Sequence, residues 1–165
     1  MDLIEKAEMV ARWAHRNQTD LSGMPYWIHC HNVAMNLRAA GYDEMIQAIG
    51  WCHDVVEDTD VTKQDMIDLF PGNANWRFID GVLAMTQMSD QKLDDYWTQV
   101  ANNEDARVVK LFGDIPDNDD PQRRKRLESN PKYAGLGERQ RAKYRRARKA
   151  LMTEQEWLDW LVLNP

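Results

Sequence analysis

Apolar positions recur along this chain every three to four residues, which is the spacing of amphipathic helices. No segment shows the strict alternation of a half-buried β-strand, and no internal repeat or low-complexity linker is visible. Over the first two thirds of the chain the pattern predicts helices at about residues 2–17, 29–40, 43–56, 62–70, 74–86, 91–102 and 105–112. Thr62 is expected to cap the fourth of these, with Asp65 three residues later completing a capping box. We therefore expect an all-α fold.

Prolines and acidic residues interrupt this pattern at residues 113–121, and each proline restricts the residue before it. We expect an acidic turn there rather than a regular helix. The C-terminal segment then predicts a short helix from Pro121, a loop at 130–137, and helices at 138–151 and 153–163. We expect a single domain over residues 1–165, with its core at about 10–120 and a basic helical segment at 121–165.

Composition agrees with a globular protein, because 43% of the 165 residues are apolar and seven are Trp. No apolar run approaches the ~20 residues that a membrane helix needs, and the N-terminus does not resemble a signal peptide. The two cysteines, Cys30 and Cys52, do not form a disulfide framework, so the cytoplasm is the expected compartment.

The net charge of −6 hides a strong asymmetry. Residues 121–150 contain twelve Lys and Arg against two Glu, a net of +10, so the remainder of the chain carries −16. One part of the molecule should attract phosphate groups while the whole repels long polyanions. We therefore expect a small phosphorylated ligand and no nucleic acid. The sequence does not decide between a monomer and a homo-oligomer.

Ionisable residues are concentrated in an otherwise apolar helical run at residues 51–60. His53 and Asp54 are followed by Glu57 and Asp58, and positions four apart lie on one face of a helix, so His53 should stack with Glu57 and Asp54 with Asp58. Burying such groups is costly unless they are paired. A divalent metal would stabilise them, since imidazole with carboxylate suits Zn, Mn or Fe. A solvated polar face is the alternative.

Two further residues point to the metal. The helices that contain His29 and His53 are joined by a short turn at 41–42 and should pack antiparallel, which brings the start of one to the end of the other. Asp114 could supply a fourth ligand from the acidic turn. Open coordination positions would admit water and a phosphate oxygen, and the carboxylates at 57 and 58 could orient that water or act as general acid and base.

The order His29, His53-Asp54, Asp114 resembles the signature of the HD-domain metal-dependent phosphohydrolases. More narrowly, the chain resembles the hydrolase domain of RelA/SpoT-type alarmone enzymes over about residues 10–118. The residues that carry this resemblance are Ala14-His15, Gln18, Ser22-Gly23, Pro25-Tyr26, His29, Val33-Ala34, His53 through Thr59, and Asp80-Gly81-Val82.

The resemblance implies an α-helical fold, usually with Mn²⁺, and hydrolysis of the 3′-pyrophosphate of guanosine 3′,5′-bis(pyrophosphate). It implies that Glu57 and Asp58 are the catalytic pair and that Asn118 lies near the substrate. Ser22, Tyr26 and Lys110 are also expected at the substrate.

The chain departs from this family at several positions. Asp20-Leu21 replaces the basic pair that helps to hold the guanosine nucleotide, and Cys30 replaces the proline after the first metal histidine. One residue more than usual separates Lys110 from Asp114, which should displace Lys110. We hypothesise that Arg123 or Arg124 of the basic segment supplies replacement phosphate contacts.

We thus predict an Mn²⁺-dependent alarmone pyrophosphohydrolase. An HD-type phosphohydrolase that acts on a different nucleotide or deoxynucleotide is a second hypothesis, and the missing basic pair keeps it open. Two non-enzymatic hypotheses are a non-catalytic nucleotide-binding module and a nucleic-acid-binding accessory protein. The Glu57-Asp58 pair argues against the module, and the acidic remainder of the chain argues against the accessory protein.

Overall fold

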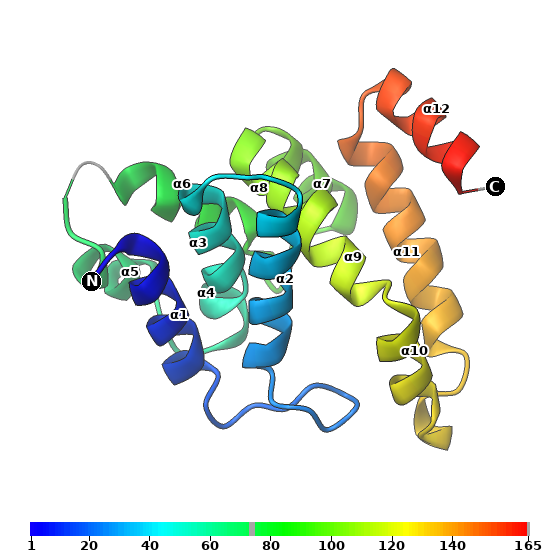
Figure 1. Ribbon diagram of the computed structural model, residues 1–165, viewed down its shortest axis with the longest axis horizontal. Helices are drawn as coiled ribbons and strands as arrows, with labels where there is room; N and C mark the ends of the chain where they lie inside the picture. The colour runs from blue at the N-terminus through cyan, green and yellow to red at the C-terminus, as the bar shows by residue number, and fades with distance from the viewer. Residues whose placement is uncertain (73–74, 165) are drawn as a thin grey trace.

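Helices make up the architecture of the computed structural model, which describes residues 1–72 and 75–164 (Figure 1). Over these ranges no β-strand occurs, and one isolated bridge joins Thr19 to Pro25. The all-α prediction is confirmed. The elements in chain order are α1 (Leu3–Ala14), α2 (Trp27–Ala39), α3 (Glu44–Cys52), α4 (Val55–Asp58), α5 (Lys63–Leu69), α6 (Trp76–Met85), α7 (Leu93–Ala101), α8 (Glu104–Val108), the π-helix η2 (Val109–Asp114), α9 (Ile115–Asn118), α10 (Pro121–Glu128), the 3-10 helix η3 (Pro131–Tyr133), α11 (Leu136–Leu151) and α12 (Glu154–Leu163).

The centre of the fold is the antiparallel pair α2 and α3, which packs against α1, α6 and η2 (Figure 1). Gly41 makes the turn between the two helices with φ +84°, and its N–H bonds the Arg38 carbonyl while the Tyr42 N–H bonds that of Leu37. A side chain would strain this left-handed conformation, which is why glycine ends the helix. The start of α2 and the end of α3 therefore lie together, as expected.

The predicted helix at 43–56 is wrong in one respect, because it breaks at His53 and Asp54 between α3 and α4. The Nδ1 atom of His53 lies 2.7 Å from the Gly50 carbonyl oxygen. A continuous helix would offer that oxygen to the Asp54 N–H, so the imidazole competes with the backbone for it. This break turns the two side chains toward the molecular centre.

The predicted acidic turn at 113–121 is also wrong over most of its length. Residues 109–114 form the π-helix η2, α9 follows directly, and only Asp119 and Asp120 are irregular. Pro116 is the second residue of α9, and its ring fixes φ at a value that suits a helix. A π-helical turn holds one residue more than an α-helical turn, so η2 accommodates the additional residue between Lys110 and Asp114.

Smaller differences concern helix ends. The first helix stops at Ala14 rather than residue 17, and α11 begins at Leu136 within the predicted loop, after η3. The expected start of the fifth helix, at 74, lies outside the described residues. The capping box of Thr62 with Asp65 is confirmed.

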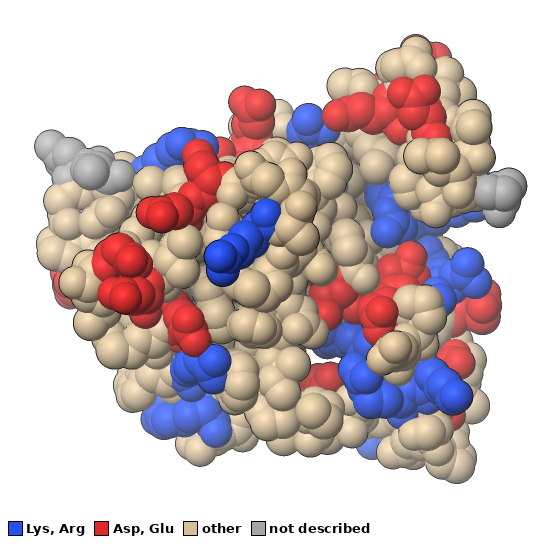
Figure 2. Space-filling view, in the orientation of Figure 1, with Lys and Arg blue, Asp and Glu red and all other residues tan. Residues whose placement is uncertain are grey.

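The basic segment packs on the rest of the molecule through α11. Its residues Tyr144, Ala147 and Leu151 are buried in the same core as α1 to α8, and α11 contacts α7 and α10. Basic side chains gather over α10 and α11, with carboxylates beside them (Figure 2). Within the described ranges, no helix has both the length and the apolar character to cross a membrane.

Candidate metal centre

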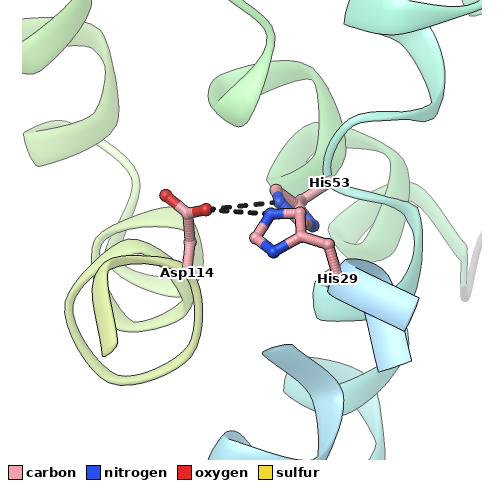
Figure 3. A group of neighbouring side chains, drawn as sticks. All are labelled: His29, His53 and Asp114. Atoms are coloured by element: carbon pink, nitrogen blue, oxygen red, sulfur yellow. Dashed lines mark ion pairs between the residues drawn. The ribbon is translucent and has the colours of Figure 1, made fainter. Parts of the chain in front are cut away.

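His29, His53 and Asp114 converge from three separate elements on one point in the core (Figure 3). His29 lies in the first turn of α2, His53 follows the end of α3, and Asp114 ends η2. The Oδ1 atom of Asp114 lies 3.2 Å from His29 Nε2 and 3.6 Å from His53 Nε2. All three side chains are buried. Their donor atoms fall within 4.8 Å of one another, which is close enough to surround one ion.

Asp54 adds a fourth donor to this group. Its Oδ2 lies 3.0 Å from His53 Nε2 and 3.5 Å from His29 Nε2. The four residues predicted as metal ligands from the sequence are thus together in space. Two imidazoles and two carboxylates form a ligand set for a borderline divalent ion such as Mn²⁺, Fe²⁺ or Zn²⁺.

The hydrogen bonds of His53 fit a metal ligand. Its Nδ1 can only donate to the Gly50 carbonyl, which leaves the Nε2 lone pair free. Nε2 is buried and makes no well-aligned hydrogen bond with the described residues, but Asp54 Oδ2 faces it at 3.0 Å. A proton on Nε2 can balance that carboxylate when no metal is bound, and a divalent ion would take the place of this proton.

His29 is held from its opposite side by Asp117, whose Oδ2 lies 2.6 Å from His29 Nδ1. Asn32 Nδ2 donates to the other oxygen of Asp117 at 2.8 Å, and Arg123 also donates to Oδ2. Neither Asp117 nor Asn32 was expected at the site. The available signal was spacing, because Asp117 follows Asp114 by about one helical turn.

The side chains of this centre stabilise one another's charged forms. Burial lowers the pKa of His53, but the carboxylates of Asp54 and Asp114 outweigh burial and raise it to about 9. Burial raises the pKa of Asp114, but Lys110 and the two histidines reverse this and hold it well below its usual range. The site is therefore a network of opposite charges in a low-dielectric environment.

Asp58 lies beside the metal residues. Tyr26 Oη lies 2.7 Å from Asp54 Oδ2 and 2.8 Å from Asp58 Oδ2, so the two carboxylates share its one hydroxyl proton. The Gln18 side chain bonds the Asp58 carbonyl, and His15 Nδ1 lies 2.5 Å from Gln18 Oε1. Burial and the neighbouring Asp54 raise the pKa of Asp58. The expected pairing of positions 54 and 58 on one face is confirmed.

Glu57, the other residue of the expected catalytic pair, is bound to the backbone of Gln87. Its Oε2 accepts the backbone N–H of Gln87 at 2.6 Å, and the break between α3 and α4 removes the helical stacking with His53 that the sequence predicted. Burial raises the pKa of Glu57, while the bond from Gln87 acts in the opposite direction.

Two of the predicted substrate residues bind Asp114 instead of standing free. Lys110 Nζ forms an ion pair with Asp114 Oδ2 at 2.7 Å and lies over the rings of Tyr96 and Trp97. Asn118 Nδ2 donates to Asp114 Oδ1 at 2.6 Å. The additional residue in η2 therefore leaves Lys110 in contact with the site, and both side chains orient the carboxylate of Asp114.

The other four predicted substrate residues line one cavity of about 260 Å³ next to the metal centre. Its lining residues are Thr19, Asp20, Leu21, Ser22, Tyr26, Arg123, Arg124, Leu127 and Gln140. Asp20 and Leu21 stand where the family has its basic pair, and α10 brings two arginines to the same place. A larger cavity of about 610 Å³ lies between α1 and α5, and none of the predicted site residues lines it.

Both arginines are paired with aspartates of the acidic segment. Arg123 binds Asp117, and Arg124 Nη1 donates to Asp119 Oδ1 at 2.9 Å. Arg148 of α11 reaches the other oxygen of Asp119 at 3.3 Å. The acidic segment thus holds α10 and α11 against the centre and leaves the arginines partly exposed in the cavity.

Lys143 of α11 is exposed but lies within electrostatic range of the centre. It lies one residue before the buried Tyr144 and three after Gln140, which lines the cavity. Burial and the nearby Lys110 lower the pKa of Lys143, while Asp114 acts in the opposite direction. Sequence reasoning counted Lys143 in the basic segment but did not place it at the site.

Comparison with known proteins identifies the family. A family model described as "HD domain" matches residues 7–112, which is more than half of the chain and includes His29, His53 and Asp54. The chain belongs to the HD-domain family. The match ends two residues before Asp114.

Curated relatives of this HD domain are alarmone enzymes by name. A guanosine-3′,5′-bis(diphosphate) 3′-pyrophosphohydrolase of Vibrio cholerae is 36% identical over 116 residues, which are 70% of this chain and 16% of that protein. The bifunctional (p)ppGpp synthase/hydrolase SpoT of Escherichia coli K12 is 34% identical over 112 residues, 68% of this chain and 15% of SpoT. The HD domain therefore spans about a sixth of the length of these relatives.

A solved structure, described as a metazoan ortholog of SpoT that hydrolyzes ppGpp, superposes on this HD domain with a TM-score of 0.67. The alignment covers 92% of this chain and 84% of the other, at 22% sequence identity. At that identity the likeness concerns the fold, and its coverage extends beyond the residues of the family match.

Proposed function

We propose that this HD domain is an Mn²⁺-dependent phosphohydrolase that removes pyrophosphate from guanosine 3′,5′-bis(diphosphate). The observation that carries the proposal is the buried group of His29, His53, Asp54 and Asp114, with Asp58 linked to it through Tyr26. The names of the relatives support the choice of alarmone substrate.

In this proposal the two imidazoles and the two carboxylates hold the ion. A bound divalent metal polarises a phosphoryl oxygen and lowers the pKa of water. Lys110 and Asn118 keep Asp114 in place through an ion pair and a hydrogen bond. The protein therefore presents its donor atoms at fixed positions before the substrate arrives.

Asp58 is the proposed general acid and base. Its pKa is raised by burial and by Asp54, so it can exchange a proton closer to neutral pH than an ordinary carboxylate. Tyr26 fixes the orientation of its carboxylate. Glu57, held by the Gln87 amide, is proposed to assist at the edge of the site by orienting the attacking water.

The substrate phosphates are proposed to lie between the metal centre and the cavity lined by Ser22, Arg123 and Arg124. The guanidinium groups supply positive charge there, although part of it is used by Asp117 and Asp119. Arginine can bind a phosphate with several donors at once.

A different nucleotide substrate is the second candidate. The observation that favours it is the set of hydrogen bonds that Asp20 accepts. Its Oδ1 accepts the Ser22 N–H at 2.9 Å, the Ser22 hydroxyl at 2.7 Å and the Met24 N–H at 3.0 Å. A carboxylate thus shapes the turn where the family places cations. This exchange changes the charge presented to the nucleotide while it leaves the metal residues intact.

Substrate profiling with Mn²⁺ tests the proposal. Pyrophosphate released from guanosine 3′,5′-bis(diphosphate), and not from nucleoside tri- or monophosphates, is the expected result. Phosphate released from monophosphates would favour the second candidate. Nucleotide binding without turnover of any compound would identify a non-catalytic module.

We also propose that residues 1–165 form one folding unit that works in the cytoplasm. The buried contacts of α11 with the core support the single unit, and the two free, buried cysteines, Cys30 and Cys52, suit a reducing compartment.

A further inference from the structure

Asp117 is a buried carboxylate that is bonded on both of its oxygens. It is 7% exposed. Oδ1 accepts from Asn32, and Oδ2 faces both His29 Nδ1, at 2.6 Å, and the guanidinium of Arg123. The carboxylate cannot rotate without losing at least one of these bonds.

The contacts decide which nitrogen of His29 carries a proton. A guanidinium can only donate, and Arg123 Nη1 lies 2.8 Å from His29 Nδ1 as well as donating to Asp117 Oδ2. The carboxylate oxygen is the closer partner of Nδ1, at 2.6 Å, and it can only accept. We therefore assign the proton to Nδ1, so that His29 and Arg123 both donate to Asp117. Nε2 then faces Asp54 and Asp114, at 3.5 and 3.2 Å, where a bound metal would take its lone pair. His53 is held in the same way, except that its Nδ1 donates to the backbone carbonyl of Gly50 instead of a carboxylate.

We propose that Asp117 is a positioning residue that fixes the tautomer and the orientation of His29 for metal binding, with Arg123 sharing its carboxylate. The inference rests on the proposed metal-dependent function. Carboxylates that accept from a ligating histidine raise the basicity of the ligand nitrogen, and their loss typically costs 10–100-fold in metal affinity.

Arg123 gives this arrangement a second consequence. It lines the cavity next to the metal centre and is 18% exposed, so a phosphate in the cavity can compete with Asp117 for its guanidinium. When Arg123 turns toward a phosphate, Oδ2 of Asp117 is left to His29, while Asn32 still donates to Oδ1. The phosphate cavity and the metal ligand are therefore connected through one carboxylate.

The test is the Mn²⁺ affinity of Asp117→Asn, measured by titration with electron paramagnetic resonance of free Mn²⁺ in the absence of substrate. We expect a loss of about 10–100-fold relative to the unmodified protein. Asp119→Asn is the matched control, because Asp119 lies two residues away and pairs with Arg124 and Arg148 instead of a histidine. It should bind Mn²⁺ like the unmodified protein. Asp117→Glu, which keeps the carboxylate, should recover part of the affinity.

Unchanged affinity in a folded Asp117→Asn variant would overturn the inference while leaving the metal site in place. An equal loss in Asp119→Asn would also overturn it, since the effect would then be general to the segment. If the unmodified protein itself bound no metal, the proposed function would fail first.

Should Asp117→Asn not fold, Asn32→Ala provides the second variant, because it removes only the bond that anchors Asp117 Oδ1. A several-fold weaker Mn²⁺ affinity is expected, and an affinity equal to that of the unmodified protein would overturn the inference.

Discussion

At the scale of single residues, each of the three basic side chains expected at the substrate already has a partner of opposite charge. Lys110 binds Asp114, Arg123 binds Asp117, and Arg124 binds Asp119. Residues that the sequence predicts as substrate contacts therefore also hold the aspartates of the site in place. Their substitution should alter metal binding as well as substrate binding.

Asp54→Ala should abolish Mn²⁺ binding and turnover together, because Asp54 faces both imidazoles. Loss of a metal that contributes several kcal/mol to the transition state corresponds to a rate decrease of about 10³-fold or more. Asp60→Ala, an exposed change of the same charge six residues away, is the control. Steady-state kinetics and metal titration measure both effects, and surviving activity in Asp54→Ala would exclude this residue as a ligand.

Tyr26→Phe should move the acidic limb of the rate profile to higher pH. The hydroxyl bond lowers the pKa of Asp58, against the upward effect of burial, so its removal raises that pKa further. A base with a higher pKa loses its proton only at higher pH, and the rate therefore rises later. Tyr42→Phe is the control, since Tyr42 contacts Phe112 away from the site. Profiles of kcat/KM against pH that coincide for all three proteins would contradict the role of Asp58.

At the scale of elements, η2 determines where Asp114 lies. Gly113 presses against α2, and a Cβ atom built on it would lie 2.8 Å from Val33 Cγ1 and 3.1 Å from Leu37 Cγ. A glycine is needed at this position because the side chains of Val33 and Leu37 pack directly against its backbone. The same approach brings Asp114, the next residue, to His29 on α2.

Gly113→Ala should therefore lower the free energy of unfolding by about 1–3 kcal/mol, the usual cost of overpacking a core. It should also weaken Mn²⁺ binding, because η2 must move away from α2. Urea denaturation and metal titration measure the two effects. Val33→Ala removes the closest contact, so the double variant should lose less stability than the sum of the single variants. Strict additivity would show that the contact with Val33 is not the cause.

At the scale of the whole molecule, opposite charges that are far apart in the sequence meet around one centre. The acidic segment at 114–120 holds the basic helices α10 and α11, and cations remain exposed around the cavity (Figure 2). The metal site joins α2, α3 and η2 at the middle of the fold. Metal binding there should stabilise the entire domain.

Chelation of metal should lower the thermal midpoint. A ligand present at 100 times its Kd stabilises the folded state by about 2.7 kcal/mol, and each kcal/mol corresponds to roughly 2–4 °C for a domain of this size. We expect a decrease of about 5–10 °C when EDTA replaces saturating Mn²⁺, as measured by calorimetry. Asp54→Ala should show no such difference. Equal midpoints for the unmodified protein in Mn²⁺ and in EDTA would contradict a metal site in the core.

Salt should lower kcat/KM more than kcat, because exposed cations near the site attract an anionic substrate and salt screens this attraction. A decrease of a few-fold in kcat/KM is expected as the ionic strength rises through the physiological range. Lys143→Gln should flatten this dependence, since Lys143 is exposed and interacts electrostatically with Asp114, Glu57 and Asp54. Lys149→Gln, on the same helix, is the matched control. Equal salt dependence in both variants would exclude a special role for Lys143.

Much of this protein could be predicted from the sequence because the information is local. The spacing of apolar residues indicates helices, since burial on one face follows the helical period. His53 and Asp54 stand out because ionisable groups are costly in an apolar run. The turn at Gly41 makes α2 and α3 antiparallel neighbours, and this is sufficient to bring His29 to the pair.

Only the tertiary structure could decide how these residues are supported. Asp117 bonds His29 across 88 positions of the chain, and Arg123 lies against the same histidine across 94. The spacing of residues along the sequence cannot predict contacts between positions so far apart. The break after Cys52 and the π-helix at 109–114 likewise depend on which carbonyl each group reaches in the packed core. Local spacing determined the helices and the candidate ligands, whereas long-range packing decided which charges hold them.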